Sequence, residues 1–208
     1  IQMDLVHHDK QYRQGTDCLY SCLGYIILGE MLEHITSATL DELAKELVWK
    51  PVGMLDTTYN PAPNLLFAPT EYKNYKNGEC WCGIVHDENA RFLRPNCSGN
   101  AGVFSTICDV TMFVQWLMEE IKEPNLLLDE DLQQLEKDLT PYASVSRTIG
   151  FLSGNRGTNY VKGCIAGKKS FGHTGFTGTS LWIDTEKDVG AILLTNRVHP
   201  TRTNIEWR

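Results

Sequence analysis

Residues 169–195 read KSFGHTGFTGTSLWIDTEKDVGAILLT, and this stretch decides the fold. Two runs rich in β-branched and apolar residues, 180–184 and 189–195, flank the polar turn Asp184-Thr185-Glu186-Lys187-Asp188. This pattern predicts an antiparallel hairpin. Residues 169–176 predict a further strand directly before it.

Upstream of this hairpin, two more strands are predicted at 147–152 and 158–165. The segment Gly154-Asn155-Arg156-Gly157 separates them and supplies turn-forming residues. The last part of the chain, residues 144–200, is therefore predicted to form an antiparallel sheet.

The preceding part, residues 1–143, carries helical periodicity instead. Apolar residues recur every three or four positions over 19–35 and again after Thr106, which predicts two amphipathic helices. A capping-box pattern at Thr39-Leu40-Asp41-Glu42 begins a third helix, which Pro51 is predicted to end.

A shorter helix is predicted from Asp129 through Leu135. Residues 52–104 are rich in Pro, Gly, Asn and Thr with little periodicity, and we expect long connecting loops there. The fold class is therefore α+β: one partial domain over 1–208 with a mainly helical and loop part followed by an antiparallel sheet.

Composition excludes several classes of protein. The 208 residues are 42% hydrophobic and 22% charged, as in ordinary globular proteins, which argues against disorder. Lys and Arg number 19 against 26 Asp and Glu, so the net charge is -7 and nucleic acid is not an expected partner. We expect neither a membrane span nor an export leader within these residues. The first residue is Ile1, so we expect a piece of a longer protein.

The chain has seven cysteines, an odd number that does not suggest a disulfide-stapled scaffold. Cys80-Trp81-Cys82 followed by His86 allows an alternative interpretation as a small metal-binding domain. No second ligand pair at zinc spacing accompanies it, so we expect free thiols and no metal. Free thiols slightly favour a reducing cytoplasm.

The glycine-rich segment Gly172-His173-Thr174-Gly175-Phe176-Thr177-Gly178 is the best candidate for a binding site. It leads into a strand and not a helix, so a phosphate-binding helix N-terminus is not expected. A polar His-Thr pair on such a strand suits an acyl-binding edge, whereas a tight loop that uses glycine for geometry alone is the other interpretation.

Five segments resemble, in order, motifs of the serine β-lactamase and penicillin-binding-protein superfamily. The match is to the class C-like branch, which includes esterases and D-amino-acid peptidases. Residues 20–29 (YSCLGYIILG) are similar to the family's YSxxGYxLLG, and 51–57 (PVGMLDT) to PLGMxxT. Residues 85–90 (VHDENA) and 99–106 (GNAGVFST) are similar to VHDxNA and GhAGLFST, and His173-Thr174-Gly175 to Lys/His-Thr-Gly.

The resemblance implies acyl transfer through the serine of a Ser-x-x-Lys motif, with no cofactor. Tyr20 would be the general base or proton shuttle, which requires a nearby cation because a phenol titrates near 10. His173 would bind a substrate carboxylate or tune Tyr20. From its spacing alone, Tyr20 is also consistent with an aromatic residue on the core stripe of a helix.

The remaining site residues implied by the resemblance bind substrate. Thr174 would supply a hydroxyl beside Gly175, and the backbone N–H of Phe176 would form half of an oxyanion hole. Cys22 stands where the family has Asn, and its thiol is a poor hydrogen-bond donor. Cys22 as the nucleophile lacks a paired base other than Tyr20.

No serine of the chain is followed three residues later by lysine. The resemblance therefore implies a fragment without its N-terminal nucleophile segment and C-terminal helix. We expect a serine hydrolase acting on a β-lactam, ester or peptide-like amide, with its own N-terminal segment as a partner. The alternative is a non-catalytic ligand- or partner-binding domain. We also expect an open apolar face over 181–195.

Overall fold

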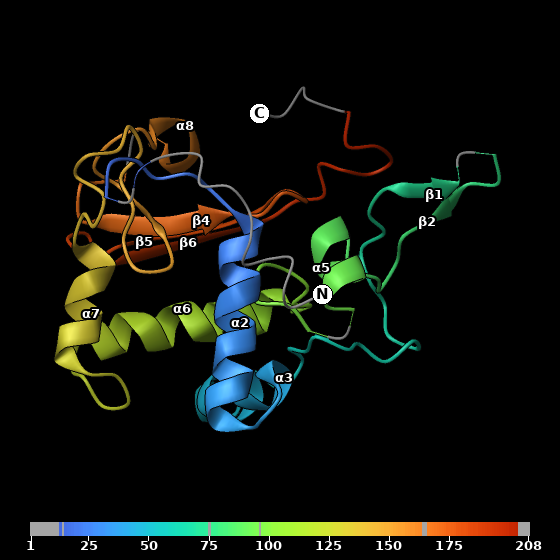
Figure 1. Ribbon diagram of the computed structural model, residues 1–208, viewed down its shortest axis with the longest axis horizontal. Coiled ribbons are helices and arrows are strands. Elements are labelled where there is room, and N and C mark those ends of the chain that lie inside the picture. The colour runs from blue at the N-terminus through green and yellow to red at the C-terminus, as the bar shows by residue number, and fades with distance from the viewer. Residues whose placement is uncertain (1–12, 14, 75, 96, 164–165, 204–208) are drawn as a thin grey trace. The chain divides into compact units, whose positions relative to one another are not determined.

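The computed structural model describes residues 13, 15–74, 76–95, 97–163 and 166–203 (Figure 1). These residues divide into two compact units. The first holds residues 20–109 and 195–203, and the second holds 110–194 with the described part of 13–19. The single partial domain over 1–208 stays a prediction.

The first helices of the first unit follow the predicted periodicity. Helix α2 spans Cys22–Thr36 and ends at Ser37, which adopts a left-handed conformation with φ 56°. Helix α3 spans Leu40–Ala44. The Thr39 hydroxyl accepts the Glu42 backbone N–H, and the Glu42 carboxylate accepts the Thr39 backbone N–H. The predicted capping box is thus confirmed.

The helix does not end at Pro51, so that prediction is wrong. A π-helical segment η1 (Lys45–Trp49) leads from α3 into α4 (Lys50–Val52), and Pro51 lies in the first turn of α4. The change to i→i+5 hydrogen bonding accommodates a residue that has no backbone N–H. Gly53, with φ 83°, ends the run instead, in a conformation that glycine adopts without strain.

Three short elements lie in the region 52–104, which the sequence predicts as loops. Strands β1 (Tyr72–Asn74) and β2 (Glu79–Cys80) pair antiparallel, and helix α5 spans Glu88–Leu93. Each element is too short to show a helical or strand period, so the loop prediction is wrong at these positions.

The second unit contains a four-stranded antiparallel sheet in the order β3-β4-β5-β6. Figure 1 labels β4, β5 and β6 of this sheet. Its strands are β3 (Leu152–Ser153), β4 (Ser170–Thr174), β5 (Thr179–Asp184) and β6 (Val189–Leu194). A helical region followed by an antiparallel sheet is the arrangement that the sequence predicts, so the predicted α+β class is confirmed.

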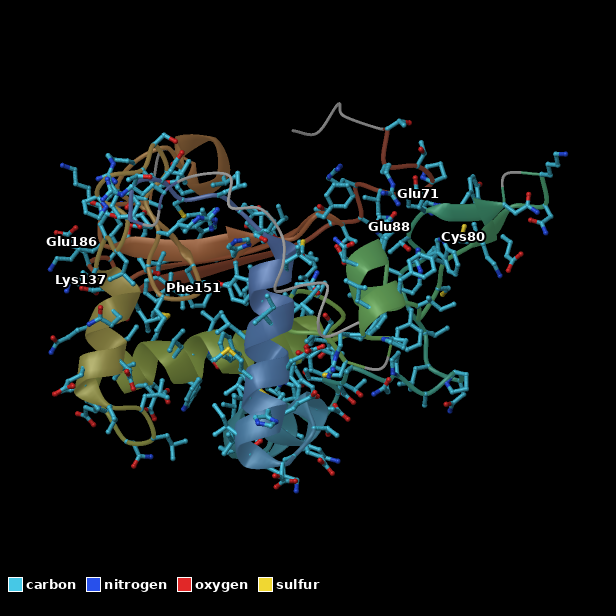
Figure 2. The ribbon with its side chains drawn as sticks, viewed as in Figure 1. Glu71, Cys80, Glu88, Lys137, Phe151 and Glu186 are labelled. Carbon is cyan, nitrogen blue, oxygen red and sulfur yellow. The ribbon has the colours of Figure 1, made fainter. Side chains whose placement is uncertain are left out.

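Helices α6 (Ile107–Lys122) and α7 (Asp129–Glu136) supply the core that packs on this sheet. Phe171 of β4 and Ile183 of β5 face each other across the ladder and are fully buried. Phe151 packs against Phe171 with ring centroids 5.3 Å apart (Figure 2). The core cluster consists of Val114, Leu117, Leu132, Leu135, Phe171 and Ile183.

The predicted strand at 158–165 is wrong, because the described part of this segment begins with a short helix, α8 (Asn159–Lys162). The N–H groups of Val161 and Lys162 both donate to the Thr158 carbonyl and wind the chain into a turn. The Lys162 ammonium donates to the carbonyls of Gly154 (2.6 Å) and Ala166 (3.1 Å). These contacts join residues no more than eight positions apart and favour a helical turn over the predicted strand.

The open apolar face expected over 181–195 is found only in β6, because Trp182 and Ile183 of β5 are buried. Val189 is 54% exposed, Leu193 58% and Leu194 44%. Within the described residues, no helix is both long enough and apolar enough to span a bilayer.

Candidate active site

His173 lies near the end of β4, opposite Leu181 of β5. Its side chain is half-buried, and Nδ1 is 2.9 Å from the Thr174 carbonyl oxygen. A carbonyl can only accept, so Nδ1 carries the proton. Nε2 is then an acceptor in the neutral ring and a donor in the imidazolium. The ring can therefore hold an anion when protonated and act as a base when neutral.

The turn after His173 is built by glycine. The Gly175 N–H donates to the Thr179 carbonyl (2.7 Å), and the Gly178 N–H donates to the Gly175 carbonyl (3.1 Å). A Cβ atom at Gly175 would lie 2.2 Å from the Thr179 Oγ1, so a larger residue cannot take this position without displacement. Phe176 lies at the turn and is 53% exposed.

Trp182 supports this strand from β5. It lies opposite Gly172, and a Cβ atom at Gly172 would come within 2.6 Å of the Trp182 side chain. The glycine thus lets a buried indole pack directly on the β4 backbone one residue before His173. We infer that this packing holds the end of β4 in place.

The other predicted site residues belong to the first unit. Tyr20 is 58% exposed and lies two residues before α2, and Cys22 is the first residue of that helix and a free, half-buried thiol. The structure brings His173, Thr174, Gly175 and Phe176 together on one strand end. Because Tyr20 and His173 belong to different units, their shared cleft stays a prediction.

The motif segments around Asp87 and Asn100 have a structural role. The Asp87 carboxylate accepts the Ala90 N–H (2.8 Å) at the start of α5 and also the Asn100 amide (3.1 Å). A Cβ atom at Gly99 would lie 2.1 Å from the Tyr25 carbonyl oxygen. Glycine at this position therefore allows the segment to approach the backbone of α2 closely.

Asp109 joins two further motif segments in the first unit. Its buried carboxylate accepts the Asp56 N–H (2.8 Å) and the Thr57 hydroxyl (2.7 Å), and Thr57 Oγ1 is 2.7 Å from Ser105 Oγ. The segments 51–57 and 99–106 are therefore tied together by buried polar contacts that are costly to lose.

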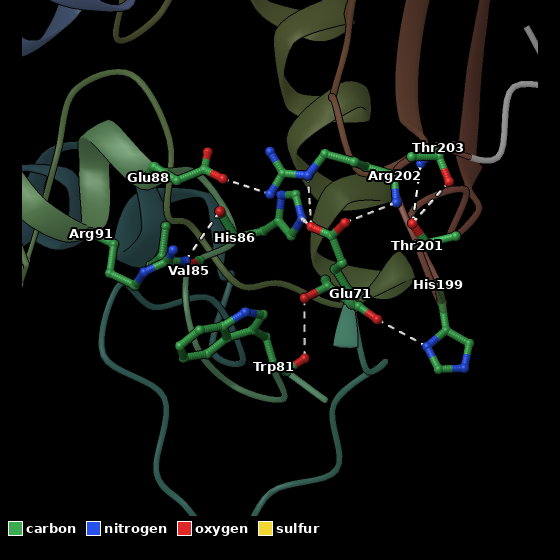
Figure 3. Close-up of polar contacts among 11 residues, drawn as sticks. Glu71, Trp81, Val85, His86, Glu88, Arg91, His199, Thr201, Arg202 and Thr203 are labelled. Atoms are coloured by element: carbon green, nitrogen blue, oxygen red, sulfur yellow. Dashed lines mark hydrogen bonds and ion pairs between the residues drawn. The ribbon is translucent and has the colours of Figure 1, made fainter. Parts of the chain in front are cut away.

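A charged cluster that the sequence analysis missed centres on Glu71 (Figure 3). The Glu71 carboxylate accepts the Arg202 N–H (3.1 Å) and its Nε–H (2.7 Å), and the buried His86 Nε2 is 3.2 Å away. The Arg202 guanidinium also reaches Glu88 at 2.5 Å. Burial raises the pKa of Glu71, but the hydrogen bonds from Arg202 outweigh it and the pKa is lowered. No local sequence pattern links Glu71 to Arg202, because the two residues lie 131 positions apart in the chain.

The Cys80, Cys82 and His86 side chains serve other contacts. The Cys80 Sγ lies 3.7 Å from the Gly78 carbonyl oxygen, and the Cys82 Sγ lies 3.5 Å from that of Phe67 (Figure 2 marks Cys80). Across the ranges that the structure describes, no group of three or more His, Cys, Asp or Glu side chains could hold a metal ion.

A pocket of about 580 Å³ opens in the first unit, with Glu33, Asp41, Arg94 and Cys97 among its lining residues. The Arg94 guanidinium pairs with both Glu30 and Glu33. Glu33 lies near the C-terminal end of α2, roughly 16 Å along the helix from Cys22. None of the predicted site residues is among the described residues that line the pocket.

Comparison with known sequences places the chain in a family. The sequence profile of the Beta-lactamase family matches residues 3–208. A Salmonella enteritidis protein, named provisionally as a D-alanyl-D-alanine carboxypeptidase, is 30% identical over 212 residues, covering 93% of this chain and 48% of that protein. A counterpart in Salmonella agona is 29% identical with the same coverage. The chain spans about half the length of the curated relatives that it matches.

Solved structures share the fold at low identity. A β-lactamase from Mycobacterium bovis aligns with a TM-score of 0.65 at 19% identity, over 89% of this chain and 59% of that one. EstCE1, a hydrolase with promiscuous acyltransferase activity, aligns with a TM-score of 0.66 at 18% identity, over 91% of this chain and 54% of that one. The fold and the family profile together show that the chain belongs to the Beta-lactamase family, within the serine β-lactamase and penicillin-binding-protein superfamily.

Proposed function

We propose that the chain carries part of the site of a serine hydrolase that acts by acyl transfer on a peptide-like amide, an ester or a β-lactam. The observation that carries this proposal is the β4–β5 turn, which presents His173, Thr174 and the Phe176 backbone side by side. Family membership supports the reaction class, and the relatives named as carboxypeptidases support a peptide-like substrate.

In the proposed reaction, the serine hydroxyl of a Ser-x-x-Lys segment attacks the substrate carbonyl. Its proton passes to the Tyr20 phenolate, and the carbonyl oxygen becomes an oxyanion that accepts the Phe176 N–H. Collapse of this intermediate expels the amine or alcohol, which takes the proton from Tyr20 and leaves an acyl-enzyme. Water then releases the acyl group by the same steps.

His173 and Thr174 are proposed to hold the substrate. With Nδ1 donating to the Thr174 carbonyl, the protonated ring presents its Nε2–H to a carboxylate. The same positive charge favours the phenolate form of Tyr20.

Covalent labelling tests this function. In the complete gene product that contains residues 1–208, a fluorescent penicillin should form a stable adduct, and a peptide ending in two D-alanines should release D-alanine. Tyr20→Phe should lower the labelling rate by about 10²–10⁴-fold, the range of general-base catalysis. Tyr25→Phe, five residues later on α2, is the matched control, and its labelling rate should stay within about twofold of wild type, since general-base loss is confined to Tyr20. Absence of both labelling and turnover would falsify the proposal.

A second candidate function is ligand or partner binding without catalysis. Two observations favour it: no serine within residues 1–208 is followed three residues later by lysine, and Cys22 stands where the resemblance places the Asn of the family. A penicillin or peptide that binds reversibly, leaves no covalent adduct and is not hydrolysed would support this function over the first.

A further inference from the structure

We propose that Phe176 forms an apolar subsite for the acyl chain of the substrate, an inference that rests on the proposed function. Phe176 exposes 53% of its surface. Every other residue from 172 to 180 is Gly, His, Thr or Ser, so Phe176 is the one large apolar side chain of the segment. An exposed ring in a small, polar turn favours packing by an apolar group of a ligand.

The turn places this ring beside the expected carbonyl position. The hydrogen bond from the Gly178 N–H to the Gly175 carbonyl makes Phe176 and Thr177 the two central residues of a β-turn. A carbonyl oxygen that accepts the Phe176 N–H lies about 2.9 Å from that nitrogen. The nitrogen and the side chain share one Cα atom, and we propose that the ring turns toward the groups bonded to that carbonyl.

Glycine at both ends permits this turn. A side chain at Gly175 would collide with Thr179, and Gly178 has φ 109°, which L-residues with side chains rarely adopt. The hydrogen bonds from Gly175 to Thr179 (2.7 Å) and from Gly178 to Gly175 (3.1 Å) close the turn, and we propose that they position the Phe176 backbone before any ligand arrives. Because the turn loses little conformational freedom when a ligand binds, more of the free energy of the apolar contact contributes to affinity.

This arrangement selects an unbranched aliphatic or an aromatic acyl group. One half-exposed ring covers only part of an acyl chain. We therefore expect binding affinity to increase by about twofold to fourfold for each of the first few methylenes. The polar parts of the substrate are proposed to bind His173 and Thr174 instead, which lie at the end of β4.

A series of p-nitrophenyl esters from acetate to octanoate tests this preference on the complete gene product. In the wild type, kcat/KM should rise with acyl length, mainly through KM. Phe176→Ala should flatten this rise, and Phe176→Leu should keep part of it. Phe92→Ala is the matched control, because Phe92 is an exposed phenylalanine (74%) on α5. It should leave the wild-type rise unchanged.

Binding provides a readout independent of turnover. NMR titration of the chain with unbranched carboxylates from acetate to octanoate should show affinity that increases with length in the wild type and is flat in Phe176→Ala. If no ester is hydrolysed but this difference persists, the proposed function fails and the subsite stands. If esters are hydrolysed but Phe176→Ala keeps the wild-type length dependence in both assays, the subsite is overturned and the proposed function stands.

Discussion

Glu120 shows how a single buried carboxylate can fix a loop of the second unit. Its oxygens accept the N–H groups of Asn125 (3.0 Å), Leu126 (2.9 Å) and Leu127 (3.0 Å) directly after α6. Burial raises the pKa of Glu120, but these three hydrogen bonds outweigh it and hold the pKa below the usual glutamate value. The ionised form is thus favoured by folding.

This shift predicts a pH-dependent stability. A lowered folded pKa contributes stability above the unfolded pKa of about 4.3, and this contribution is lost as pH falls through the folded pKa. Glu120→Gln should lower the free energy of unfolding near pH 7 by about 1–3 kcal/mol and flatten its decrease below about pH 5. Urea unfolding over a pH series measures both effects. Glu119→Gln, at an exposed neighbour, should behave as wild type; a wild-type slope in Glu120→Gln would contradict the account.

Cys97 should be the least reactive thiol of the first unit. Burial, with the nearby Asp41 and Glu33 carboxylates, raises the pKa of Cys97 to about 12. Only the thiolate reacts, so alkylation with iodoacetamide at pH 8 should modify the exposed Cys82 and spare Cys97 until urea is added. Peptide mass mapping gives the result. Equal labelling of the two cysteines in the native protein would show that Cys97 is not held as described.

At the residue scale, the sequence predicts what is local. His173, Thr174 and Gly175 lie at the end of a strand, as their spacing indicates. Glu71 and Arg202 escape prediction because their partnership depends on two segments that only the tertiary fold brings together. The roles of Tyr20 and Cys22 stay predictions.

At the scale of elements, the contact between α6 and β6 depends on a missing side chain. A Cβ atom at Gly190 would lie 2.4 Å from Val114 Cγ1. Gly190→Ala should therefore lower the free energy of unfolding by about 1–3 kcal/mol through overpacking.

Gly24→Ala is the opposite control for this substitution. Gly24 lies within α2, and a Cβ atom there meets nothing within 4 Å. Alanine should raise stability by about 0.5–1 kcal/mol, because it favours the helix. Chemical denaturation of both variants measures the pair. A Gly190→Ala protein as stable as wild type would show that α6 does not pack this closely on β6.

The predicted elements differ in accuracy because they differ in length. Helices α2 and α6 run for 15 and 16 residues, so their apolar period is readable in the sequence. Helix α8 has four residues and β3 two, and individual hydrogen bonds of Thr158 and Lys162, such as that from Lys162 to the Gly154 carbonyl, shape the turn around α8. Periodicity cannot report such contacts.

At the scale of the whole molecule, exposed apolar side chains should govern the behaviour of the chain in solution. Leu193 of β6 and Leu28, Met31 and Ile35 of α2 are each about half exposed or more. We predict that the isolated 208-residue chain associates as its concentration rises, because burial of this surface is favourable. Light scattering over a concentration series measures it. A chain that stays monomeric and also hydrolyses esters unaided would refute this prediction.

The family and the fold class are readable from the sequence because five motifs lie in order and the period changes from helix to strand. The proposed shared site is not readable, since it depends on whether Tyr20 and His173, which belong to different units, lie in one cleft. The order of the motifs implies one site for Tyr20 and His173, but it gives no distance or orientation between the two side chains.

A double-mutant cycle tests the proposed shared site most directly, with the rate of acylation by a fluorescent penicillin as the readout in the complete gene product. Tyr20→Phe, His173→Ala and the double variant are compared with wild type. If both side chains serve one acyl-transfer step, the double variant should lose far less than the product of the two single losses. Losses that simply multiply, or single variants that acylate at the wild-type rate, would contradict a shared site.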